Sequence, residues 1–97
     1  MNGIDVQCAA REDGWRCTVA ITDRHGSSVH DVTVASADAE HLAAARELPD
    51  VERLVYETAT FLLEREARES ILRSFDITVV GRYFPEFDAE IRSRLAP

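Results

Sequence analysis

The 97-residue chain contains no lysine, two cysteines, three prolines and four glycines. The glycines are isolated from one another, so the chain carries no glycine-rich phosphate-binding loop. No window holds 18 consecutive apolar residues, the minimum for a transmembrane helix. The N-terminal stretch MNGIDVQCAA has neither a positive flank nor a long apolar run, as a secretory signal would. From these absences we expect a cytoplasmic protein.

Basic residues are also scarce, with 11 against 18 acidic residues and a net charge of -7. Affinity for nucleic acid comes mainly from contacts between basic side chains and phosphates, so we expect no nucleic-acid partner. The acidity favours a basic protein partner instead. Every basic residue is arginine, and this bias together with frequent alanine indicates a GC-rich genome. The length and the hydrophobic fraction of 45% predict a single globular domain, 1–97.

Alternating apolar and polar residues fill the first third of the chain. This period of two, rich in β-branched residues, predicts strands at 3–9, 15–22 and 28–34. Asp13-Gly14 is a strong signal for a tight turn between the first two strands. The sequence therefore predicts a three-stranded antiparallel meander with the middle strand central.

The register of the first hairpin follows from its turn. If Glu12 and Asp13 form the tip, residues whose numbers sum to 25 lie opposite each other, and Cys8 faces Cys17. This register places every apolar side chain on one face, which a slip of one residue would undo. In a cytoplasmic chain we expect both thiols to be reduced and to act as small core residues. A redox pair is the alternative, whereas two cysteines supply half a zinc site at most.

Helical periodicity dominates the rest of the chain. Ser36 is a candidate N-cap for the first helix, and Pro49 marks a break before the second. In the second helix the buried stripe is predicted to run through Leu54, Thr58 and Phe61. The predicted helices cover one face of the sheet and give an α+β fold; they span 37–47, 50–68, 70–84 and 86–95.

The stretch 70–87 holds four of the seven aromatic residues. Its apolar positions continue at intervals of three or four residues, which predicts a helical face; they are Ile77, Val80, Phe84, Phe87, Ile91 and Leu95. Pro85 predicts a break at 84–86, and Ser74 or Asp76 is placed to cap the preceding helix. A fourth strand at 76–82 is the alternative, because ITVV has high strand propensity.

No arrangement of side chains predicts a catalytic site, a cofactor or a metal. The three histidines, His25, His30 and His41, do not have the spacing of a helical metal site. Asp76 is the candidate acid–base group, with helix capping as its simpler role. The polar side chains that packing does not explain form a candidate interaction surface, which consists of Arg73, Ser74, Asp76, Arg82, Tyr83 and Glu86.

The segments ESILRSFD (69–76) and RYFPEF (82–87) resemble the tail of a family of small bacterial proteins, expected to be actinobacterial, to which no activity is assigned. The similarity extends upstream through FLLERE (61–66). It implies a structural hallmark and supplies no functional residues. Three strands followed by helices also resemble, in element order alone, antitoxins of the HicB type and double-stranded-RNA-binding folds.

The sequence favours a non-enzymatic, protein-interacting or self-associating module. A three-stranded sheet leaves two edges open, here 3–9 and 28–34, and neither contains proline or lysine to prevent strand addition. The alternatives are an antitoxin-like or regulatory partner, and a small-ligand-binding or acid–base enzyme with a pocket between the sheet and residues 70–87.

Overall fold

The computed structural model describes residues 3–96. Three long strands form the predicted antiparallel meander: β1 (Gly3–Arg11), β2 (Gly14–Asp23) and β3 (Gly26–Ala35). Opposed residues of β1 and β2 have numbers that sum to 25, as Cys8 with Cys17 does, so the predicted register is confirmed.

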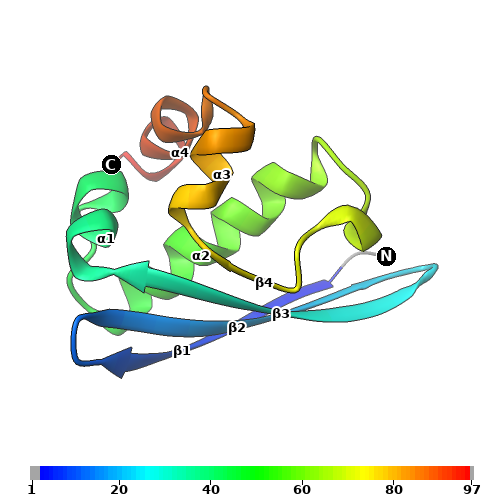
Figure 1. Ribbon diagram of the computed structural model, residues 1–97, viewed down its shortest axis with the longest axis horizontal. Coiled ribbons are helices and arrows are strands. Elements are labelled where there is room, and N and C mark those ends of the chain that lie inside the picture. The colour runs from blue at the N-terminus through cyan, green and yellow to red at the C-terminus, as the bar shows by residue number, and fades with distance from the viewer. Residues whose placement is uncertain (1–2, 97) are drawn as a thin grey trace.

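All helices lie on the same side of the sheet, so the predicted α+β class is confirmed (Figure 1). The outer face is left uncovered and carries mainly polar side chains such as Gln7, Arg16 and Thr18. The helices are α1 (Ser36–Ala43), α2 (Leu48–Leu63), α3 (Thr78–Tyr83) and α4 (Phe87–Leu95), with a short 3-10 helix, η1 (Arg68–Ser70), after α2. No helix within residues 3–96 is long and apolar enough to span a bilayer.

The helix predicted over 70–84 is wrong in its first half. In its place β4 (Ser74–Asp76) pairs parallel with β3 and extends the sheet to the order β1-β2-β3-β4. The backbone N–H of Asp31 donates to Arg73 (2.8 Å) and that of Ile77 to Thr33 (2.9 Å). The alternative strand over 76–82 is also wrong, because α3 begins two residues after β4.

Helix boundaries differ from prediction by a few residues. Ser36 is the first residue of α1 and not its cap, because Ala35 occupies the N-cap position without a side-chain hydrogen bond. The second helix ends at Leu63, five residues before the predicted end. The break at 84–86 is confirmed, although Pro85 lies in the turn and does not open α4.

The core lies between the sheet and the helices. The predicted apolar face of the C-terminal third is confirmed, since Ile77, Val80, Phe87 and Ile91 are buried. Phe61 of α2 is fully buried and contacts the rings of Phe84 and Phe87 edge-on. Helix α4 is therefore anchored on α2, which itself covers the sheet (Figure 1).

The two cysteines form a disulfide, so the expectation of free thiols is wrong for this structure. Their Cα atoms are 4.0 Å apart, the close spacing of a non-hydrogen-bonded antiparallel pair. In such a pair the side chains approach closely, which brings the two sulfurs within bonding reach. The N–H of Cys8 accordingly points away from β2 and donates to Glu52 of α2 (3.1 Å).

Candidate functional site

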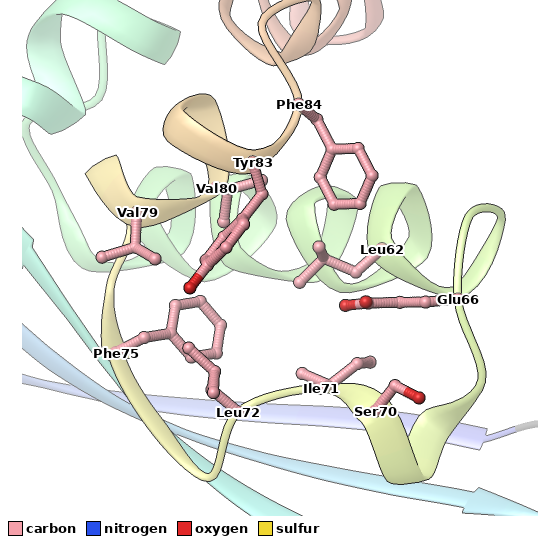
Figure 2. A pocket seen from close by; sticks show the side chains of 10 residues that line it. All are labelled: Leu62, Glu66, Ser70, Ile71, Leu72, Phe75, Val79, Val80, Tyr83 and Phe84. Atoms are coloured by element: carbon pink, nitrogen blue, oxygen red, sulfur yellow. The ribbon is translucent and has the colours of Figure 1, made fainter.

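A pocket of about 450 Å³ opens between the C-terminal end of α2 and α3 (Figure 2). This volume falls within the range of about 300 to 1,000 Å³ typical of ligand sites. Seven of its ten lining side chains are aliphatic or phenylalanine; the others are Glu66, Ser70 and Tyr83. The apolar lining consists of Leu62, Ile71, Leu72, Phe75, Val79, Val80 and Phe84.

The side chains inside the pocket are buried, whereas those at its rim are exposed. Leu62, Ile71 and Val80 are nearly fully buried and form its inner wall. Leu72 and Tyr83, in contrast, are 48% and 68% exposed. Large apolar surface that remains exposed beside a concavity is typical of a binding site.

One wall of the pocket is the segment 66–73, which we call the arm. It leaves α2, forms η1 and leads into β4 (Figure 1). Arg68 fixes it to the β2–β3 turn: its side chain is only 8% exposed and its Nε donates to Asp23 at 3.1 Å. The pKa of Asp23 is lowered, chiefly by the hydrogen bond from the N–H of His25, and Arg68 adds to this effect.

The far end of the arm is fixed by His30. This side chain points into the core from β3 and is buried. Its Nδ1 lies 2.7 Å from the carbonyl oxygen of Leu72, and its Nε2 lies 2.7 Å from the Ser28 hydroxyl. A carbonyl can only accept, so Nδ1 carries a proton and donates it. The pocket wall is thus pre-organised at both ends, which reduces the entropic cost of binding.

Asp76 lies one residue before the N-cap position of α3, which Ile77 occupies, and its side chain is hydrogen-bonded to the first helical residue. Its Oδ1 accepts from the N–H and hydroxyl of Thr78, and its Oδ2 accepts from the Thr33 hydroxyl at 2.8 Å. Burial opposes ionisation, but these hydrogen bonds outweigh it and lower the pKa of the Asp76 carboxyl. An anionic, fully engaged carboxylate is suited to capping and is a poor general acid.

Part of the predicted interaction surface lies at β4: Ser74 and Asp76 belong to this strand, and Arg82 is near enough to help lower the pKa of the Asp76 carboxyl. Tyr83 is the only one of its six residues that lines the pocket. Arg73 and Ser74 are exposed on the connection to β4 and on β4 itself, and Arg82 is an exposed residue of α3. Glu86 pairs with Arg65 at 3.2 Å on the α2–α4 side. That these six residues contact a partner stays a prediction.

Sequence reasoning missed Glu66, the only charged side chain among the described residues that line the pocket. It lies in the turn that follows α2, and its carboxylate points into the pocket in Figure 2. In the sequence it stands within the run Glu64-Arg65-Glu66, which is typical of a solvated helix face. Glu66 differs from its neighbours only because α2 ends at Leu63, which lets the chain turn and place this side chain at the pocket.

The sheet edges differ from the prediction of two open edges. The edge at 28–34 is not open along its length, because β4 pairs with Asp31–Thr33. Strand β1 remains an edge strand over nine residues. The outward N–H of Cys8 donates its hydrogen bond to the Glu52 carboxylate, so this part of the edge is not free to pair with another strand.

The three histidines lie in separate places. His25 is exposed in the β2–β3 turn, His30 is buried in the core, and His41 on α1 lies 3.7 Å from Asp88 of α4. Within residues 3–96, no group of three or more metal-binding side chains is arranged to hold an ion.

No protein-family model, curated protein or solved structure matches this chain. The pocket is therefore interpreted from its own geometry.

Proposed function

We propose that this protein is a non-enzymatic binding module that accepts an apolar group of a partner protein in the pocket between α2, the arm and α3. The observation that carries the proposal is the carbon-rich lining of a pocket whose wall is fixed by Arg68 and His30. Polar groups are few there and none forms a nucleophile–base pair.

A protein partner is favoured over a free small molecule by the rim. Leu72 and Tyr83 stand largely exposed beside the pocket mouth, where a small ligand held inside would leave them in water. A protein surface would cover both and bury their apolar area, as the fully buried centre of an interface does. An antitoxin-like or regulatory complex with a basic protein, which the net charge of -7 favours, is one form of this proposal.

The rim of the pocket can be tested with a small apolar probe and a substitution at Leu72. Phenylbutanol, a neutral apolar probe, is expected to shift the backbone amide resonances of pocket residues in a titration followed by NMR. Leu72→Glu places a charge at the mouth, where an apolar group must be desolvated, and is expected to weaken binding about tenfold or more.

The matched control is Tyr56→Glu on α2. Tyr56 is 43% exposed and does not line this pocket, so its replacement is expected to leave the affinity within about twofold of the wild-type value. Equal affinity of Leu72→Glu and the wild-type protein would contradict the proposed site. Urea unfolding of both variants checks that the fold is retained.

Self-association through β1 is a second candidate function. The observation that favours it is a nine-residue edge strand without proline or lysine. Light scattering behind size exclusion, run over a dilution series, is expected to show a dimer that dissociates on dilution. A monomer at every concentration would remove self-association from the account and leave the pocket proposal intact.

We also propose that the protein is located in the cytoplasm. The Cys8–Cys17 disulfide argues against this location, because the cytoplasm keeps most protein thiols reduced. In that compartment the pair is expected to be recovered as two thiols, which alkylation of freshly lysed cells followed by mass spectrometry would measure.

A further inference from the structure

We infer that the pocket selects a positively charged occupant, namely an ammonium or guanidinium group next to an apolar stem. This inference rests on the proposed function and specifies the chemistry of the partner segment: an apolar residue beside a lysine or an arginine. It starts from Glu66, whose carboxylate is the one charged group that residues 3–96 contribute to an otherwise carbon-rich lining (Figure 2).

The Glu66 carboxylate has no hydrogen bond or ion pair with any other residue in the range 3–96, and the side chain is partly buried. Other acidic side chains of this region behave differently. Glu64 pairs with Arg94 and Arg65, Glu69 pairs with Arg68, and Glu86 pairs with Arg65. A carboxylate held beside apolar surface without a cation is most stabilised by one that a ligand supplies.

Three aromatic rings add a second, independent preference for a cation. Phe75 of β4, Tyr83 of α3 and Phe84 after α3 all line the pocket, and Figure 2 shows the Tyr83 ring extending across the cavity toward Phe75. Aromatic faces attract ammonium and guanidinium groups, and the effect grows as water is excluded. Rings together with one carboxylate are therefore suited to a cation that carries an apolar stem.

The net negative charge of the chain also favours a positively charged occupant, and it acts over a longer range than Glu66. The chain carries 18 acidic and 11 basic residues, so it attracts a basic partner before contact and repels an acidic one. An occupant that presents a carboxylate to Glu66 would suffer both repulsion and desolvation. The pocket should accordingly rank occupants as cation over neutral group over anion.

The test compares three probes with the same apolar body, a phenyl ring on four methylene groups: phenylbutylamine, phenylbutanol and phenylpentanoate. Affinities are measured by NMR titration of the full chain at low ionic strength, and at neutral pH the amine is protonated. We expect the amine to bind about fivefold to tenfold tighter than the alcohol, and the acid to bind weakest. Added salt should reduce this preference.

Glu66→Gln is expected to bring the amine and the alcohol within about twofold of each other while the alcohol still binds. Glu57→Gln, the same change on α2 at a residue that does not line the pocket, is expected to keep the wild-type preference. Equal affinities of the three probes for the wild-type protein would overturn the charge inference and leave the proposed function standing. No binding of any probe at the pocket would overturn both.

Discussion

Replacing Gly14 by alanine is expected to destabilise the protein by about 3 kcal/mol or more, because an added methyl group has no room. An ideal Cβ at Gly14 would lie 2.2 Å from the carbonyl oxygen of Val34 and 2.8 Å from the Cα of Ala35. Both atoms belong to the backbone, so neither can rotate away. The start of β2 would have to separate from the end of β3 and from the junction between β3 and α1.

The junction is also held by a hydrogen bond that such a separation would stretch. The N–H of Ser36, the first residue of α1, donates to the carbonyl oxygen of Asp13 at 3.1 Å. Urea unfolding followed by circular dichroism measures the loss. Gly3→Ala is the control, since nothing lies within 4 Å of its ideal Cβ, and it is expected to change stability by less than about 0.5 kcal/mol. A Gly14→Ala protein as stable as the control would show that the close approach is absent.

Phe61→Ala is expected to cost about 3 to 5 kcal/mol, the usual range for truncating a fully buried phenylalanine. The Phe61 ring lies 5.9 Å from that of Phe84 and 5.1 Å from that of Phe87, measured between centroids. The guanidinium of Arg65 lies 3.5 Å above the Phe61 ring centroid. Removal of the Phe61 ring would leave a cavity between α2 and α4 and loosen Phe84 at the pocket.

Comparing Phe61→Leu with Phe61→Ala shows how much of the loss comes from removing apolar volume. Phe61→Leu keeps most of the apolar volume and is expected to cost less than half as much as Phe61→Ala in the same denaturation experiment. A loss below about 1.5 kcal/mol for Phe61→Ala would contradict the central packing role. Domains of this size are stable by roughly 5 to 15 kcal/mol, so the alanine variant is expected to unfold at a clearly lower urea concentration than the wild-type protein.

The sheet was largely predictable from local chemistry. Alternation of apolar residues and the Asp13-Gly14 turn determine the hairpin register, because a slip by one residue would expose Val19 and Ile21, both buried in the structure. The apolar spacing around Ile77 and Ile91 likewise identified buried positions before the helices were known.

The arm and β4 were not predictable in the same way. Ser74-Phe75-Asp76 is too short to show a period, and its pairing depends on contacts with β3, which lies more than 40 residues earlier. The buried Arg68 reads as an ordinary surface charge in a run of acidic and basic residues, and only its partner Asp23 explains its burial. The pocket is built from these long-range contacts, so its lining could not be derived from spacing.

The disulfide shows the limit of arguing from composition. The register correctly placed Cys8 opposite Cys17, yet the expectation of a reducing compartment led to free thiols. Geometry alone favours the bond, because a non-hydrogen-bonded pair brings the two side chains together.

The central claim is that an apolar group binds between α2, the arm and α3. Nuclear Overhauser contacts between phenylbutanol and the methyl groups of the protein test it most directly. We expect contacts to Leu62, Ile71 and Val79, which line the pocket, and none to Val29, an exposed residue on the outer face of the sheet. Contacts to Val29 without contacts to the three pocket residues would contradict the account.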